Sequence, residues 1–295
     1  VPAELEGQVS QYIEEITEAA AEADDELLEK YFEEGELSHE EILVGYRKGM
    51  QAGKIVPVVA VSAVTGVGVA KLMDMMVDYL NSPLGGVMEG VNPKTDEPAT
   101  RKCDNAEPFS AYVFKTVADP FVGKLSLVKV TSGTLTPATA LYNATQEKAE
   151  KAGGLFVMRG KKQTNVPVLN AGDIGALSKL NFTATGDTLC DPGNPVRFAP
   201  IVFPQPSISK AVYATKQGEE DKVFTGLARL QEEDPSIQTS KNAETTETLL
   251  SGQGELHLDV VRAKLASKFG AAASLEDPKV PYRETIRKTV SAQGR

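Results

Sequence analysis

Residues 113–135 read Val-Phe-Lys-Thr-Val-Ala-Asp-Pro-Phe-Val-Gly-Lys-Leu-Ser-Leu-Val-Lys-Val-Thr-Ser-Gly-Thr-Leu. This stretch predicts a β-hairpin. Its first apolar run ends at Asp119-Pro120, where proline fixes φ and supplies no N–H, and its second run leads into a turn at Ser132-Gly133. By itself, a hairpin of this kind indicates either a β-barrel or a β-sandwich.

The sequence around the hairpin continues in the same pattern. From Phe109 to Phe198, short β segments alternate with turn residues, which favours a small closed barrel. Pro200, Pro204 and Pro206 then mark a boundary. We therefore predict a barrel domain at residues 107–200.

After this boundary the pattern changes to alternating strands and helices. The expected order is βαββαβ, a ferredoxin-like α+β arrangement at residues 201–277. Its predicted elements are a strand at 208–215, a helix at 219–231, strands near Ile237 and at 245–250, a helix at 255–269 and a strand near 271–275. Residues 278–295 are expected to begin a strand of a further domain.

The first 53 residues predict acidic helices. A three-and-four spacing of apolar residues over 4–33 predicts one amphipathic helix that ends at Gly35, and the capping box Ser38-His39-Glu40-Glu41 opens the next helix. The predicted inward residues of the first helix are Leu5, Val9, Tyr12, Ile13, Ile16, Ala20, Ala23, Leu27 and Tyr31. Its other face is almost all glutamate, which fits either a solvated face or a binding surface.

Residues 55–84 predict half of a βαβ unit. Ile55–Val61 is a continuous apolar run, typical of a strand buried on both faces of a parallel sheet. Ser62-Ala63, a glycine-bearing turn and an amphipathic helix follow, the helix with Val69, Leu72, Met76 and Leu80 inward. The neighbouring strands that such a unit needs are not in this sequence. Residues 85–106, rich in Gly, Pro, Asn, Asp and Lys, are expected to be a linker.

Composition excludes several classes of protein. The 295 residues have room for about two or three domains, and a hydrophobic content of 41% is ordinary for a globular protein. The apolar run Val56–Val61 is far shorter than a membrane span, and Val1 opens no signal sequence, so we expect a cytoplasmic protein without a membrane partner. Cys103 and Cys190 are expected to be free thiols.

Two histidines are too few for a zinc site or a histidine-based triad. His39 and His257 lie far apart in the sequence, and a packed or capping role is expected for His257. We therefore expect no catalytic residue and no metal ligand in this chain.

The negative charge is concentrated at one end. Residues 1–53 hold 15 Asp/Glu and 3 Lys/Arg, a balance of −12, while the whole chain carries −10. An acidic head on a nearly neutral body fits a protein that contacts RNA at one place and a basic protein at another.

The motifs of a complete GTPase site are missing from the sequence. Such a site needs a glycine loop ending in Lys-Ser/Thr, an Asp-x-x-Gly and an Asn-Lys-x-Asp. Gly123-Lys124 is followed by Leu125, Gly160-Lys161 is followed by Lys162, and Asn92-Pro93-Lys94-Thr95-Asp96 has the wrong spacing. Ser62-Ala63 fits one element of a guanine site, in which a backbone N–H meets the guanine O6, and it equally fits an ordinary turn between a strand and a helix.

Several blocks together resemble bacterial elongation factor G, the ribosomal translocase. The hairpin of 113–135, Ala171-Gly172-Asp173-Ile174 and Thr185-Gly186-Asp187-Thr188-Leu189-Cys190 resemble its second domain. Three later segments resemble its third domain and the beginning of its fourth: Glu233-Asp234-Pro235, Glu247-Thr248-Leu249-Leu250-Ser251-Gly252-Gln253-Gly254-Glu255-Leu256-His257-Leu258 and Val280-Pro281-Tyr282-Arg283-Glu284-Thr285-Ile286. Residues 1–84 resemble the late part of its nucleotide domain, including an inserted acidic helical subdomain at 1–53 and the guanine loop Ser62-Ala63.

The resemblance implies a multidomain α/β and β protein. It begins with the C-terminal part of a P-loop GTPase domain with an acidic helical insert (1–84), followed by the linker (85–106). A translation-factor β-barrel (107–200), a ferredoxin-like α+β domain (201–277) and the start of a fourth domain (278–295) come next. The intact protein would bind GTP and Mg²⁺ and hydrolyse GTP, whereas this chain alone is expected to be inactive and to hold no cofactor.

The implied partner is the ribosome. The barrel would contact small-subunit ribosomal RNA, and the acidic helices would contact the stalk protein. GTP hydrolysis would be coupled to tRNA–mRNA translocation or to a related rearrangement of the ribosome. The protein is expected to be a monomer. The candidate RNA contacts are Lys115, Lys124, Lys129, Arg159, Lys161 and Lys162. Surface lysines that only keep a barrel soluble are the alternative.

Two departures from the housekeeping factor indicate a divergent paralogue: Gln253 replaces a usual methionine, and Met158-Arg159-Gly160-Lys161-Lys162-Gln163 replaces the usual strand end. A ribosomal protection factor of the tetracycline-resistance type and a non-catalytic ribosome-binding module stay open as alternatives.

Overall fold

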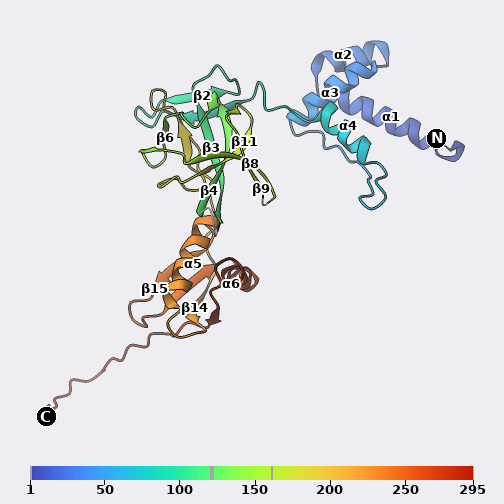
Figure 1. Ribbon diagram of the computed structural model, residues 1–295. Coiled ribbons are helices and arrows are strands. Elements are labelled where there is room, and N and C mark those ends of the chain that lie inside the picture. Colours follow the sequence, from blue (N-terminus) through green and yellow to red (C-terminus); the bar gives the residue numbers. More distant parts are fainter. Residues whose placement is uncertain (1, 120–122, 161, 295) are drawn as a thin grey trace. The chain divides into compact units, whose positions relative to one another are not determined.

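The computed structural model describes residues 2–119, 123–160 and 162–294. The chain divides into two compact units, Val1–Ser82 and Pro83–Arg295 (Figure 1). Each unit is described by itself.

The first unit is helical. Its elements are η1 (Ala3–Leu5), α1 (Glu6–Ala21), α2 (Asp25–Glu34), α3 (His39–Gln51) and α4 (Val69–Tyr79). The capping box is confirmed, because Ser38 Oγ accepts a bond from the Glu41 amide while the Glu41 carboxylate accepts one from the Ser38 amide. Gly35 ends α2 with a φ of 76°, as its position after the helix predicts.

The single helix predicted over 4–33 is wrong. The chain leaves the helix after Ala21 and begins α2 at Asp25, because the Asp24 side chain accepts a bond from the Leu27 amide and so caps a new helix. Only part of the predicted apolar stripe is buried: Ala20 is fully buried, whereas Tyr12, Ile13 and Ile16 are exposed.

Glycines let α1 and α3 lie close together. A Cβ added at Gly45 would come within 2.2 Å of the Ala20 carbonyl oxygen, and one added at Gly49 would meet Ile55 at 2.4 Å. Helix α3 therefore packs on α1 through Gly45 and Ala20, while Gly49 makes room for Ile55.

Residues 55–61 do not form the predicted doubly buried strand. They belong to no helix or strand, and Val56 and Val58 are 79% and 93% exposed while Ile55 is half-buried. The physical reason is that no described strand of residues 2–82 pairs with them. The following α4 has Leu72 half-buried but Met76 and Leu80 exposed, so the apolar face predicted for this helix is largely open.

The segment predicted as a linker, 85–106, is instead folded. Strands β1 (Val87–Val91) and β2 (Pro98–Lys102) form an antiparallel hairpin, and β1 also pairs with β13 (Arg197–Phe198). Met88 and Ala99 pack on a small core of Ala144, Cys190, Val196 and Phe198. Turn-forming residues in this stretch shape the hairpin loop, which composition alone does not distinguish from a linker.

The main sheet of the second unit is antiparallel and curves around one core (Figure 1). Its strands lie in the order β7 (Lys148–Glu150), β6 (Leu141–Asn143), β12 (Thr188–Cys190), β3 (Ser110–Asp119), β4 (Gly123–Ser132), β11 (Ile174–Ser178), β8 (Gly154–Arg159) and β9 (Lys162–Asn165). The predicted hairpin is the pair β3–β4, and it has bulges near Ser110 and Val113. A small sheet of β5 (Thr134–Leu135) and β10 (Leu169–Asn170) adds Leu135 and Leu169 to the same core.

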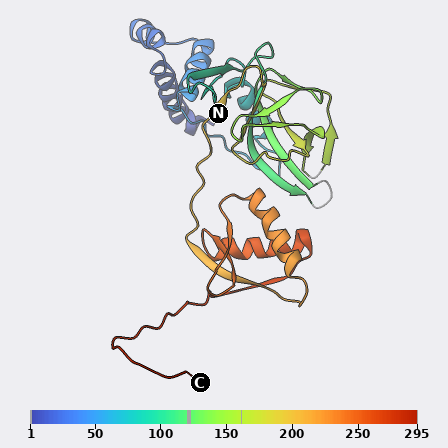
Figure 2. The ribbon, with the colours of Figure 1, turned by 90° about the vertical axis from the view of Figure 1, so that its left-hand side faces the viewer.

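The last part of the unit has the predicted order of strands and helices. Sheet strands lie in the order β15 (Gln238–Lys241), β16 (Thr248–Gly252), β14 (Ile208–Ala214) and β17 (Ala273–Glu276). Helices α5 (Glu220–Glu233) and α6 (Glu255–Phe269) pack on one face of this sheet, as Figure 2 shows in orange and red. Val223, Leu227, Ile237, Leu258 and Leu265 lie in its core. We call residues 203–277 the third domain and residues 83–200 the barrel domain.

Residues 278–294 form no helix or strand in the structure, so the strand predicted to start here is wrong. Tyr282 is 90% exposed, and no described strand pairs with this segment. Two contacts hold it near the third domain: the Lys279 amide donates to Glu247, and Arg283 pairs with Glu244.

Candidate functional site

The loop at Ser62-Ala63 is tightly turned. Ser62 Oγ accepts a bond from the Thr65 amide, the Ser62 carbonyl accepts one from Gly66, and the Ser62 amide donates to Val67 at 2.9 Å. Gly68 then begins α4 with a φ of 79°, where a Cβ would lie 2.6 Å from the Ala60 carbonyl oxygen. Ala63 is exposed at the edge of this turn, so its backbone is accessible to a ligand.

The described candidate RNA contacts lie on two hairpins, β3–β4 and β8–β9. Lys115 and Lys129 are exposed on the neighbouring strands β3 and β4, and Arg159 faces Lys162 across the β8–β9 hairpin. Lys161 lies outside the described residues. Lys124 forms an ion pair within the protein: its ammonium group lies 3.5 Å from the Glu232 carboxylate of α5, and its side chain is only 22% exposed.

The tip of the β3–β4 hairpin spans 120–122, which lie outside the described residues. At its end, Gly123 pairs with Asp119 and has a φ of 85°, a conformation that side chains other than glycine rarely adopt. Among the described residues, nothing lies within 4 Å of a Cβ built at Gly123. The glycine is therefore explained by its backbone angle.

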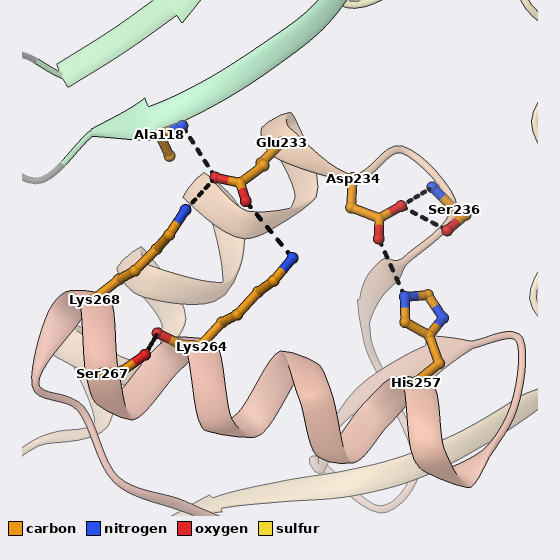
Figure 3. A network of polar contacts seen from close by, with 8 residues as sticks. All are labelled: Ala118, Glu233, Asp234, Ser236, His257, Lys264, Ser267 and Lys268. Carbon is orange, nitrogen blue, oxygen red and sulfur yellow. Dashed lines mark hydrogen bonds and ion pairs between the residues drawn. The ribbon is translucent and has the colours of Figure 1, made fainter. Parts of the chain in front are cut away.

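A network of charges joins the barrel to the third domain (Figure 3). Glu233, at the end of α5, accepts a bond from the Ala118 amide of β3 at 3.2 Å and one from Lys268 at 2.6 Å, with Lys264 3.7 Å away. The Glu233 side chain is 12% exposed. We call Ala118, Glu233, Lys264 and Lys268 the junction cluster.

The charge of Glu233 is stabilised where it lies. Burial raises the pKa of this carboxyl, but the bonds from Lys268 and from the Ala118 amide outweigh it, and the net pKa is lowered. Glu233 is therefore ionised at neutral pH and acts as an acceptor for both domains.

His257 is half-buried at the start of α6 and makes polar contacts through both ring nitrogens, which agrees with the packed or capping role predicted for it. Its Nδ1 accepts a bond from the Gln253 amide, and its Nε2 lies 3.1 Å from Asp234 Oδ2 (Figure 3). Asp234 also accepts bonds from the amide and hydroxyl of Ser236. Burial raises the pKa of Asp234, while Ser236 and His257 lower it further than burial raises it. The pair ties the start of α6 to the end of α5.

Residue-level reasoning missed the junction cluster. Glu233 and Asp234 stood in the sequence as part of a family motif, but no local pattern pairs them with Ala118, which is 115 positions away from Glu233. Their function as a contact between domains comes only from the tertiary structure.

The acidic face of α1 is open to solvent. Glu14, Glu18 and Glu22 follow one another at four-residue spacing and are all exposed. Within 2–119, 123–160 and 162–294, no group of three or more His, Cys, Asp or Glu side chains is placed to hold a metal ion. No helix in the same ranges is both long and apolar enough for a membrane span.

Comparisons with known proteins agree with this architecture. Residues 108–192 match the family of elongation factor G domain 2, and residues 203–277 match that of elongation factor G domain III. A crystal structure of a protein from Thermus thermophilus superposes with a TM-score of 0.79 at 30% identity, over 98% of this chain. The chain belongs to the elongation factor G family.

The match extends beyond the two family domains. Because it covers 98% of the chain, it includes the helical unit, and it spans 41% of the length of the Thermus protein. The junction cluster joins the two matched domains of the elongation factor G family, since Ala118 lies in the first and Glu233 in the second.

Proposed function

We propose that this chain is part of an elongation factor G-like GTPase that binds the ribosome and couples GTP hydrolysis to tRNA–mRNA translocation or a related ribosomal rearrangement. The observation that carries this proposal is the succession of elongation factor G domains 2 and III in one chain, connected through Glu233. Folds of this kind serve many functions, so the family match matters more than the architecture.

The proposal assigns a role to each part. Residues 1–84 complete a P-loop GTPase domain, where Ser62-Ala63 would contact guanine, and GTP and Mg²⁺ would be held by the intact protein. The third domain is ferredoxin-like, which its βαββαβ order supports. The protein would be a cytoplasmic monomer.

Two surfaces would meet the ribosome. Lys115, Lys129, Arg159 and Lys162 are exposed and available for phosphate contacts, whereas Lys124 already pairs with Glu232. The acidic face of α1 would attract a basic surface such as that of the ribosomal stalk. Electrostatic attraction of this kind acts mainly on the association rate and weakens with salt.

The departure at Gln253 has a structural use. Its side-chain amide donates to the carbonyl groups of Pro204 and Gln205, which lie at the start of the third domain, shortly after the end of the barrel domain. A methionine has no N–H to donate there. This difference supports assignment to a divergent paralogue.

Charge reversal tests the proposed stalk contact. Glu14, Glu18 and Glu22 would be changed together to lysine in the full-length protein, and ribosome-stimulated GTP turnover would be measured at low salt. At low salt we expect the variant to turn over GTP more slowly than the wild type. As salt is added to both proteins, the two rates should approach each other. An unchanged rate at low salt would mean that this helix face is only solvated.

A further inference from the structure

An exposed aromatic ring stands on the loop between β11 and β12. Phe182 is 48% exposed, and the ammonium group of Lys148 lies 4.3 Å from the centre of its ring. This ring belongs to no core cluster among the described residues. It is therefore free to contact another molecule.

The loop that carries the ring is held by a buried carboxylate. Glu150, 9% exposed at the end of β7, accepts bonds from the amides of Asn181 and Phe182 at 3.1 and 2.6 Å. It also accepts one from the Thr183 hydroxyl at 2.9 Å. Hydrogen bonds to a charged acceptor are stronger than neutral ones, so Glu150 fixes the backbone on both sides of the ring.

A second carboxylate holds the other end of the loop. Asp187, 4% exposed, accepts a bond from the Ala184 amide at 2.8 Å and one from Asn143 at 2.9 Å. Asn143 also donates to the Thr183 hydroxyl. These bonds hold the backbone that carries Phe182, and a held backbone lowers the entropy cost of binding through the loop.

Further basic residues lie near Phe182 and Glu150 in the sequence. Besides Lys148, Lys151 directly follows Glu150, and Lys179 precedes the loop with an unusual φ of 60°. Both are exposed, and Glu147 is the acidic neighbour in sequence. The Glu150 carboxylate accepts bonds from the loop, so the exposed charged residues near it or near the loop in the sequence are three lysines and Glu147.

We propose that Phe182, with Lys148, Lys151 and Lys179, forms a platform for an unpaired base of RNA. An exposed aromatic ring stacks on any base, and neighbouring lysines meet the phosphates of the same strand. A protein partner would also be attracted by an exposed ring, but the surrounding lysines favour a polyanion. The proposal rests on the proposed function, since a ribosome-bound protein meets RNA.

Binding of the full chain to a fluorescent, unstructured 12-nucleotide RNA tests the platform. Because stacking contributes roughly 1–3 kcal/mol per base, we expect Phe182→Ala to weaken RNA binding at least about fivefold, whereas Phe182→Tyr keeps the affinity. Lys148→Gln should weaken binding, and it should reduce the slope of the logarithm of the binding constant against the logarithm of salt concentration by about one, the value for one phosphate contact. Phe32→Ala, which removes a 78% exposed ring from acidic α2, and Lys71→Gln on α4 are the matched controls, and neither should change the affinity.

Thermal melting of each variant confirms that the barrel is folded, and pelleting with small ribosomal subunits gives an independent readout. The platform is refuted if the wild-type chain does not bind the RNA, or if Phe182→Ala binds it as tightly as the wild type. It is also refuted if Phe182→Ala reduces pelleting with ribosomes but not RNA binding, because the partner would then be a protein. RNA binding that depends on Phe182 without any pelleting would support the platform and contradict the proposed function.

Discussion

Glu233 is the side chain that connects the barrel to the third domain most directly. It lies at the C-terminal end of α5, and its carboxylate is shared between the Ala118 amide of β3 and Lys268 of α6. A neighbouring carboxylate, Glu232, makes only a longer contact with Lys124 and is 51% exposed. The two adjacent residues therefore differ in burial while both face the barrel.

We expect Glu233→Ala to destabilise the second unit by about 1–3 kcal/mol, because it leaves the Ala118 amide and Lys268 without their acceptor. Glu232→Ala is the control and should cost less than about 1 kcal/mol, as exposed ion pairs do. Urea unfolding of both variants measures the difference. If Glu233→Ala lowered the free energy of unfolding no more than Glu232→Ala does, the stabilising role assigned to the Glu233 contact would be contradicted.

Helix packing in the first unit depends on glycine at one position and not at another. A Cβ at Gly45 of α3 would meet the Ala20 carbonyl oxygen at 2.2 Å, whereas nothing lies within 4 Å of one at Gly7 of α1. Gly45→Ala should therefore lower the melting temperature, with a cost of about 1–3 kcal/mol. Gly7→Ala should raise it, since alanine favours helix by about 1 kcal/mol. Circular dichroism at 222 nm follows both, and a stabilising Gly45→Ala would contradict this packing.

The capping box of α3 should make its stability depend on pH. The bond from Lys30, helped by those from Ser38, lowers the pKa of Glu41 from 4.5 to about 2. Because this pKa is depressed on folding, the stabilisation is complete above pH 4.5 and disappears as pH falls towards 2. The melting temperature of the wild type should be higher than that of Glu41→Gln at pH 6, and the difference between the two should disappear by about pH 2. A difference that stays constant over this range would contradict the assignment.

At the level of elements, sequence patterns predicted most of the third domain and of the β3–β4 hairpin. Strand and helix periodicity are local signals, and they were sufficient for these elements. In the first unit, Gly35 and the capping box at Ser38 are local signals of the same kind, and they predicted the end of α2 and the start of α3. The break at Asp24 was missed because one capping hydrogen bond overrides a continuous apolar spacing. Strands β1 and β2 were missed because the turn-forming residues of their hairpin have the composition of a linker.

The candidate site was predicted less completely. The exposure of Lys115 and Arg159 follows from their positions on the sheet, but the ion pair of Lys124 needs a helix more than 100 residues away. The Glu150 contacts that hold Phe182 likewise join segments 31 or more positions apart. Contacts of this kind depend on the folded sheet and leave no pattern in the sequence.

For the whole molecule, the central claim is that these domains bind the ribosome. The acidic charge lies in residues 1–53, so the remaining surface can approach ribosomal RNA without strong repulsion. Contacts to phosphates release counterions, and binding should therefore weaken steeply as salt rises.

Sedimentation of the purified chain through a sucrose cushion, with and without ribosomes and over a series of salt concentrations, tests this claim most directly. We predict that the chain pellets with ribosomes at low salt and that the pelleted fraction falls as salt increases. The same pelleted fraction with and without ribosomes at the lowest salt would contradict it.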